Sequence, residues 1–262
     1  MFENSNYELW HGDCLELMDN IPDKSIDCII TDLPYGITRC KWDVVIPFEP
    51  LWKQYGRVIK DNGAILLFSI QPFTSALVMS NIRMYRYEWI WQKKHPKGHL
   101  NAKKMPMRAH ENIEVFYKKL PVCNPQMTHG HKRRVAKTNY TREADGSSCY
   151  GREVRNTLYD STDRYPLDIQ AFSNANYSGK IHNTQKPVEI YEYFMKTYTN
   201  ENETVLDSAA GSMTCAIAAI NTCRKVICIE KDKEIFETGR DRVMEYLVKR
   251  GEENGITDKR KI

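Results

Sequence analysis

The chain of 262 residues is long enough for one sizeable α/β domain with an insertion, and its length does not require two hydrophobic cores. With 41% hydrophobic and 27% charged residues, its composition is that of a soluble globular protein and excludes wholesale disorder. No apolar run approaches the roughly 20 residues that span a bilayer, and the polar residues at the start lead us to expect no secretory signal. The eight cysteines form no Cys-x-x-Cys pair, so we expect reduced, buried thiols in a cytoplasmic protein.

The net charge of +4 conceals an uneven distribution of charged residues. Between Lys93 and Thr157 there are 15 Lys and Arg against 5 acids, whereas the rest of the chain holds 23 bases against 29 acids. A solvated loop could produce such a segment by chance. Concentrated Lys and Arg are more typical of a surface that neutralises phosphates, so we expect a polyanion to bind here.

Short β-branched runs predict strands, and longer patterned runs predict helices near the end of the chain. The turn sequence 61–63 is expected to precede the second strand. The predicted strands are Ser25–Thr31, Ala64–Ser69, Tyr87–Gln92, Ile113–Lys118, Thr204–Leu206 and Lys225–Ile229. The predicted helices are Thr214–Asn221 and Lys233–Lys249, the latter ended by Gly251. Strands that alternate with helices favour a doubly wound, mostly parallel α/β sheet.

Residues 120–180 interrupt this alternation, because they are rich in Asn, Thr, Ser, Gly, Arg and Tyr and hold few apolar runs. A structureless loop of that length is uncommon inside a compact domain. We therefore interpret 120–180 as an inserted, irregular recognition region. It separates a catalytic half, 1–119, from a cofactor-binding half, 181–262.

The first candidate site is Asp32-Leu33-Pro34-Tyr35-Gly36, which follows a predicted strand directly. Ligands bind at the carboxyl ends of such strands. Methylation of an amino group needs an acceptor for the amine hydrogens and a flat face for a base taken out of its stack. Asp32 can supply the acceptor, Tyr35 the face, and Pro34 can fix the backbone between them. The alternative is an ordinary turn at a strand end.

The second candidate site is the C-terminal βαβ unit. A strand ends at Asp207, small residues occupy 208–213, a helix begins near Thr214, and Glu230 follows nineteen residues after Gly211. This is the arrangement that binds nucleotides, in which the acid accepts the ribose hydroxyls. The full glycine pattern is absent, so the alternative interpretation is an ordinary βαβ unit in which Glu230 is solvated and binds no ligand.

Three separate motifs resemble those of the permuted, β-class amino-methyltransferases of DNA. Gly12-Asp13 and the run from Ser25 to Gly36 resemble the family's start, with its Asp-Pro-Pro-Tyr motif. His182 to Pro187 resembles its Thr-Gln-Lys-Pro element, and Val205 to Thr214 resembles its cofactor loop. The resemblance covers residues 7 to about 245 and is poorest between 120 and 180.

The resemblance implies a Rossmann-like fold, S-adenosylmethionine as cofactor and specific roles for individual residues. The Asp32 carboxylate and the Leu33 carbonyl would hold the target amine, with Pro34 between them and Tyr35 on the flipped base. The expected cofactor-binding residues are Asp13, Asp32, Thr184, Lys186, Asp207, Ala209, Gly211, Ser212, Met213, Thr214 and Glu230. The expected DNA-binding residues are Lys93, Lys94, Lys97, Lys103, Lys104, Arg108, Lys132, Arg133, Arg134 and Lys137.

Three residues of the cofactor loop depart from the family's usual Asp-Pro-Phe-x-Gly-Ser-Gly-Thr, the first being Ser208 in place of the Pro. Ala209 replaces the Phe, and Met213 replaces the second Gly. A glycine there can adopt a positive φ that methionine resists. The Ala- and Ile-rich run after Met213 favours the other interpretation, in which Met213 lies in the first turn of the helix.

The function that the resemblance implies is site-specific methylation of adenine N6 in double-stranded DNA. Cytosine N4 methylation, a DNA-binding relic with weak or no activity, and methylation of RNA or protein amides are the alternatives. The histidine spacings fit no zinc site, so no metal is expected. Duplex DNA is the expected partner in a prokaryotic or phage-infected cell. The sequence does not determine whether the chain forms a homodimer or whether a separate restriction endonuclease accompanies it.

Overall fold

The computed structural model describes residues 2–4, 6–142, 153–174 and 185–251. It divides the chain into two compact units, of which the smaller is Pro125–Leu167. The smaller unit is shorter than the insertion expected at 120–180, because Ile169–Phe172 form a strand of the large unit's sheet. It contains β7 (Arg134–Arg142) and β8 (Glu153–Ser161), which pair as a two-stranded antiparallel ribbon.

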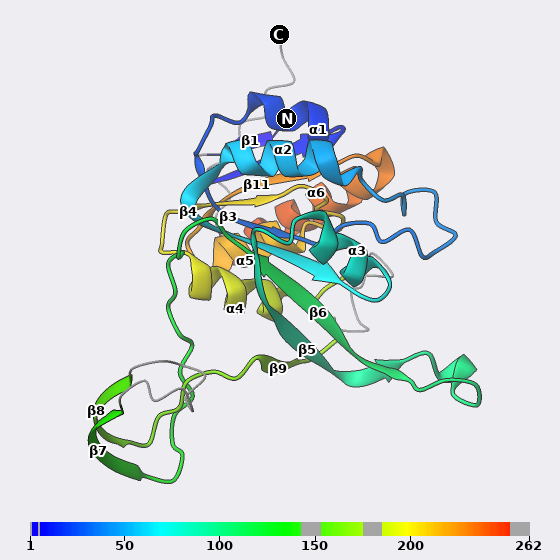
Figure 1. Cartoon of the computed structure of the whole chain (residues 1–262). Coiled ribbons are helices and arrows are strands. Elements are labelled where there is room, and N and C mark those ends of the chain that lie inside the picture. Colours follow the sequence, from blue (N-terminus) through cyan, green and yellow to red (C-terminus); the bar gives the residue numbers. More distant parts are fainter. Residues whose placement is uncertain (1, 5, 143–152, 175–184, 252–262) are drawn as a thin grey trace. The chain divides into compact units, whose positions relative to one another are not determined.

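The described residues of the large unit form one nine-stranded sheet, which confirms the predicted α/β class (Figure 1). The strand order is β1-β2-β11-β10-β3-β4-β6-β5-β9. The five central strands, β2 to β4 in that order, are parallel, while β6 is antiparallel to both β4 and β5. The strands are β1 (Phe2–Asn4), β2 (Tyr7–His11), β3 (Ile26–Thr31), β4 (Ile59–Ser69), β5 (Tyr85–Lys97), β6 (Arg108–Phe116), β9 (Ile169–Phe172), β10 (Thr204–Asp207) and β11 (Lys225–Glu230).

Helices cover both faces of this sheet, as the burial of its central strands on both faces requires. Along β3, Cys28 and Ile30 join one core cluster and Ile29 joins the other, since successive side chains point to opposite faces. On one face lie α1 (Cys14–Leu17), α2 (Phe48–Val58) and α3 (Phe73–Ser80), with the short 3-10 helix η1 (Met18–Asn20). On the other lie α4 (Val188–Tyr198), α5 (Thr214–Asn221) and α6 (Lys233–Arg250). No helix in the described ranges is long and apolar enough to cross a bilayer.

Most predicted elements are present, and local sequence explains their limits. The helix α6 begins after Asp232, whose side chain accepts hydrogen bonds from the backbone of Glu234 and Ile235, and it ends at left-handed Gly251. The turn expected at 61–63 is wrong, because these residues lie inside β4 where its register with β3 shifts. Four cysteines are buried as expected, whereas three others are exposed and Cys149 lies outside the described residues. The buried ones are Cys14, Cys28, Cys215 and Cys228.

The direction of winding reverses between β10 and β3. From β3 the chain passes through α2 to β4 on one side, and from β10 it passes through α5 to β11 on the other. In open α/β sheets, ligands bind in the crevice that such a reversal leaves at the carboxyl ends of the strands. The loops after β3 and β10, which carry the two sequence motifs, both begin at this crevice.

Candidate active site

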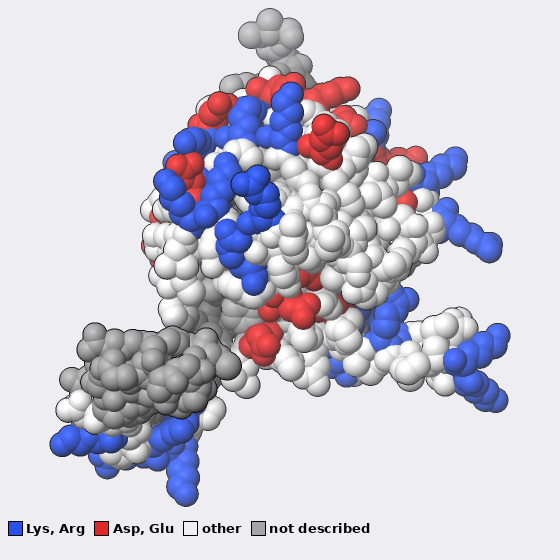
Figure 2. Space-filling model, viewed as in Figure 1, with Lys and Arg blue, Asp and Glu red and all other residues white. Residues whose placement is uncertain are grey.

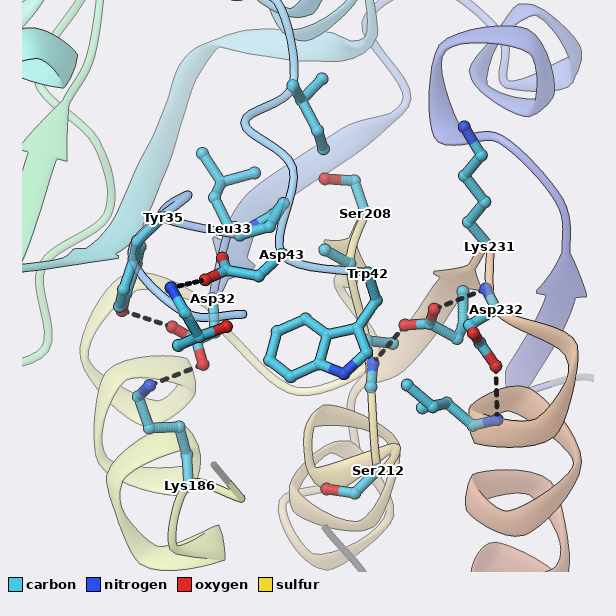
Figure 3. Close-up of a pocket in the computed structure, with 18 of the residues that line it drawn as sticks. Asp32, Leu33, Tyr35, Trp42, Asp43, Lys186, Ser208, Ser212, Lys231 and Asp232 are labelled. Atoms are coloured by element: carbon cyan, nitrogen blue, oxygen red, sulfur yellow. Dashed lines mark hydrogen bonds and ion pairs between the residues drawn. The ribbon is translucent and has the colours of Figure 1, made fainter. Parts of the chain in front are cut away.

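A pocket of about 880 Å³ lies at the carboxyl ends of β3, β10 and β11. Its walls include residues 32–35 after β3, residues 208–212 after β10 and Glu230 at the end of β11. Figure 3 shows Asp32 and Lys186 on one side of this pocket and Lys231 and Asp232 on the other. One continuous pocket therefore joins the two motifs that the sequence analysis identified separately.

Asp32 is held from both sides by side chains of the pocket. Its Oδ1 accepts a hydrogen bond of 2.5 Å from the Tyr35 hydroxyl, and its Oδ2 lies 2.5 Å from the Lys186 ammonium. Burial, together with the nearby Asp32 charge, raises the pKa of the Tyr35 phenol well above its usual value. Tyr35 therefore stays protonated and remains a donor to Asp32. The carboxylate has a fixed orientation and retains lone pairs for a further donor.

Lys186 belongs to a chain of alternating charges that is almost excluded from solvent. Its ammonium also lies 3.2 Å from the carboxylate of Glu111, and Glu111 pairs in turn with Lys93. The side chains of Lys186 and Lys93 are 7% and 8% exposed, so this network is buried. Burial lowers the pKa of Lys186, but the carboxylates of Asp32 and Glu111 outweigh it and raise that pKa above its ordinary value. The ammonium is thus permanently charged beside Asp32.

The loop that follows Tyr35 is fixed by Asp43. Its carboxylate accepts hydrogen bonds from the backbone nitrogens of Gly36, Ile37 and Thr38 at 2.7–3.0 Å. Gly36 has a φ of 69°, and a Cβ there would lie 2.8 Å from a methyl group of Val45, so the loop needs glycine at this point. The same loop carries Trp42, whose indole reaches into the pocket (Figure 3).

The cofactor half of the pocket is organised by Glu230. One of its oxygens accepts a hydrogen bond from the backbone of Gly211 and the other from that of Asp232, both at 2.8 Å. Burial raises the pKa of this carboxyl. Across the rim, Asp13 caps α1 and forms a 2.8 Å ion pair with Lys231. Nothing would lie within 4 Å of a Cβ on Gly211, so the loop backbone is open to a ligand. A carboxylate at a strand end, exposed loop backbone and a pocket of this volume fit S-adenosylmethionine.

Two expected cofactor-binding residues lie behind the loop instead of on the pocket wall. Asp207 is 1% exposed, and burial, reinforced by the charges of Asp32 and Glu230, raises its pKa to about 8. Met213 is fully buried in the core. The expectation that Met213 occupies the first helical turn is wrong, because it has a φ of 56° and precedes α5 as its N-cap.

Tertiary packing explains why a methionine occupies this left-handed position. A Cβ on Gly239 of α6 would lie 2.8 Å from the Met213 side chain, so the glycine leaves the room that the methionine fills. A non-glycine residue in this conformation costs about 1–2 kcal/mol. Truncation of a buried methionine costs about 2–5 kcal/mol. The packing therefore outweighs the backbone strain.

We expect Met213→Gly to lower the free energy of unfolding by about 1–4 kcal/mol, since lost packing exceeds relieved strain. Met213→Ala should be the less stable of the two variants by about 1 kcal/mol, because alanine loses the packing and keeps the strain. Urea denaturation of both variants measures the difference. Equal stabilities would show that position 213 carries no strain.

The remaining expected site residues converge on the pocket. Those on its wall are Asp13, Asp32, Leu33, Pro34, Tyr35, Lys186, Ala209, Gly211, Ser212, Thr214 and Glu230. Thr184 lies outside the described residues. The pocket wall also includes Glu111, Asp43 and Asn174, which belong to no sequence motif and could not be predicted from the sequence. Within the described ranges, no cluster of three or more His, Cys, Asp and Glu side chains could hold a metal ion.

Lys93 differs from the other cations of the basic segment. It was expected to contact DNA, but it is buried in the pocket and paired with Glu111. Lys94, Lys97, Lys103, Lys104 and Arg108 are all exposed, and Figure 2 shows Lys and Arg side chains at the surface in this part of the large unit. Exposed Lys132, Arg133, Arg134 and Lys137 lie in the smaller unit, where Arg133 pairs with Asp160 at 2.6 Å.

Comparison with known proteins identifies the class of protein that this fold and pocket define. Residues 26–241 match the N6/N4 family described as DNA methylase. The Type II methyltransferase M.BglII of Bacillus subtilis is 25% identical over 255 residues, which cover 88% of this chain and 67% of the relative. The chain belongs to this family of DNA methylases, whose methyl donor is S-adenosylmethionine.

Two solved structures share the fold. The crystal structure of the M1.HpyAVI–SAM complex has a TM-score of 0.60 at 22% identity, over 90% of this chain and 99% of the other. The cytosine-N4-specific PvuII DNA methyltransferase has a TM-score of 0.65 at 16% identity, over 91% and 86% of the two chains.

Proposed function

We propose that this protein methylates adenine N6 at specific sites in double-stranded DNA. The observation that carries the proposal is the position of Asp32, a fixed carboxylate next to the Tyr35 ring in the pocket that fits the cofactor. The family covers both amino groups, but members with Asp at this place methylate adenine more often. The resemblance of the chain's Asp-Leu-Pro-Tyr motif to these members therefore favours adenine.

In the proposed reaction, Asp32 and the Leu33 carbonyl accept the two hydrogens of the target amine, which keeps the nitrogen lone pair directed at the methyl donor. When bound, S-adenosylmethionine would supply a methyl group carried on a positively charged sulfur. The leaving group is the demethylated cofactor, a neutral thioether. Tyr35 holds the flipped base by stacking, worth roughly 1–3 kcal/mol. After transfer the nitrogen loses one proton, which Asp32 is placed to accept.

We assign the cofactor's parts to the residues that organise the other half of the pocket. The Glu230 carboxylate would accept the ribose hydroxyls, and the open backbone near Gly211 would contact the methionine part. Asp13 and Asp232 would lie near the adenine ring. These assignments are supported by the fixed orientation of Glu230 and by the open space above Gly211.

We further propose that DNA phosphates contact the exposed cations of both units. In the large unit these are Lys94, Lys97, Lys103, Lys104 and Arg108, and in the smaller unit Lys132, Arg133, Arg134 and Lys137. Phosphate neutralisation by such residues gives binding that weakens steeply with salt.

The rival function is cytosine N4 methylation, because the same acceptor geometry serves either amine. Sequencing of modified bases in DNA from cells that express the protein tests the proposal. We expect N6-methyladenine within one recurring sequence, and N4-methylcytosine there would instead favour the rival. A second rival is a DNA-binding relic, suggested by Ala209 and Met213. Calorimetric titration with S-adenosylmethionine distinguishes it, since a relic without cofactor affinity would give no binding heat.

A further inference from the structure

Residues 94–110 form an arm whose every residue is exposed to solvent. The arm comprises the end of β5, the 3-10 helix η2 (His99–Asn101) and the start of β6, and it extends from the sheet in Figure 1. Its sequence holds four Lys and one Arg and lacks Asp and Glu. An element that buries no residue contributes little to the core. Its uniform positive charge fits a polyanion.

The arm is folded although it is exposed. Its tip turns at Gly98, which has a φ of 95°, and continues through backbone hydrogen bonds of 2.8–3.1 Å made by Asn101, Ala102 and Lys104. At the base, the Asn174 side chain accepts a hydrogen bond from the nitrogen of His95 and donates one to its carbonyl. The arm therefore presents its tip in a defined orientation before any partner binds.

The tip exposes apolar side chains among its cations. Leu100 is 88% exposed, Met105 57% and Met107 41%. Single exposed apolar residues are normal at protein surfaces. Here three of them share one arm with five cations, a combination that proteins use to enter DNA grooves and separate stacked bases. Leu100, in η2 at the end of the arm, is the most exposed of the three.

The base of the arm forms one wall of the active-site pocket. Lys97 and Arg108 line this pocket, as do Asn174 and the buried pair of Lys93 and Glu111. Lys186 links that pair directly to Asp32. A duplex held by the cations of the arm would therefore lie beside the opening that a flipped base must enter.

We propose that the arm is a DNA probe whose tip residue Leu100 inserts into the base stack as the target base leaves it. This inference rests on the proposed function, because it requires duplex DNA as substrate. The leucine side chain would occupy space that the flipped base vacates and slow its return. It would therefore assist base extrusion without contacting the reacting atoms.

The test compares two duplexes that carry the recognised sequence. In one the target adenine is paired, and in the other it faces an abasic position, so its extrusion is easier. We expect Leu100→Ala to slow single-turnover methylation of the paired duplex by about tenfold or more and that of the unpaired duplex by less than about threefold. Leu100→Phe should retain the rate on both. Met79→Ala, which removes a similarly exposed side chain on α3, is the matched control.

The outcomes separate this inference from the function on which it rests. Equal losses on both duplexes, or no loss on either, would overturn the insertion of Leu100 while leaving the methylation proposal intact. A Leu100→Ala variant that changes from oligomer to monomer in sedimentation would assign the tip to a second copy of the chain and also overturn it. If the wild type methylates neither duplex, the proposed function itself fails.

Discussion

Asp32→Ala should abolish methyl transfer while cofactor affinity stays within a few-fold of the wild type. In the proposed reaction the Asp32 carboxylate holds the target amine, and its orientation is fixed by Tyr35 and Lys186. Loss of a positioned group that handles a proton lowers rates by about 10²–10⁴-fold. Single-turnover methylation of duplex DNA and calorimetric titration with S-adenosylmethionine measure the two quantities separately.

Two further variants sharpen this prediction. Asp32→Asn keeps the shape and one acceptor oxygen, so it should retain more activity than alanine. Asp61→Ala removes an exposed carboxylate that pairs with Lys24 and Lys119 far from the pocket, and it should leave the rate unchanged. Wild-type turnover in Asp32→Ala would show that the catalytic assignment is wrong.

Lys186→Met should destabilise the protein by about 3–5 kcal/mol and strongly reduce methyl transfer. The substitution removes the cation between Asp32 and Glu111 and leaves two carboxylates without their shared partner. Breaking a buried ion pair from one side is costly because the remaining charge stays desolvated. The double variant Lys186→Met/Glu111→Gln should regain part of this stability, since glutamine carries no charge, but it should not regain activity.

Lys231→Met provides the control for the buried network. Lys231 pairs with Asp13 at the rim of the same pocket, but its side chain is 76% exposed. Exposed ion pairs contribute about 0–1 kcal/mol, so this variant should unfold close to the wild type. Chemical denaturation of the four proteins compares the two environments. Similar losses for Lys186→Met and Lys231→Met would contradict a buried, structurally coupled role for Lys186.

The sequence was sufficient to predict features that depend on short stretches of chain. The apolar run before Asp32 predicts a central strand because a doubly covered strand buries both its faces. The spacing from Asp207 through Gly211 to Glu230 predicts the βαβ unit, since strand, turn and helix lengths are local properties. Once two such units wind in opposite directions, their loops must meet at one crevice. Most of the pocket could therefore be predicted before any tertiary contact was known.

Contacts between distant segments decided the rest. Glu111 follows no motif, and it joins the site because β6 lies antiparallel between β4 and β5 and brings its carboxylate to Lys186. Lys93 is a surface cation by sequence pattern, but that same pairing buries it. Met213 was expected in a helix because its neighbours favour one. Its side chain instead packs into the space beside Gly239, and this packing stabilises its left-handed backbone conformation. Sequence determines the strands and loops that carry the chemistry, whereas packing decides which side chains are desolvated together, because burial depends on residues far apart in the chain.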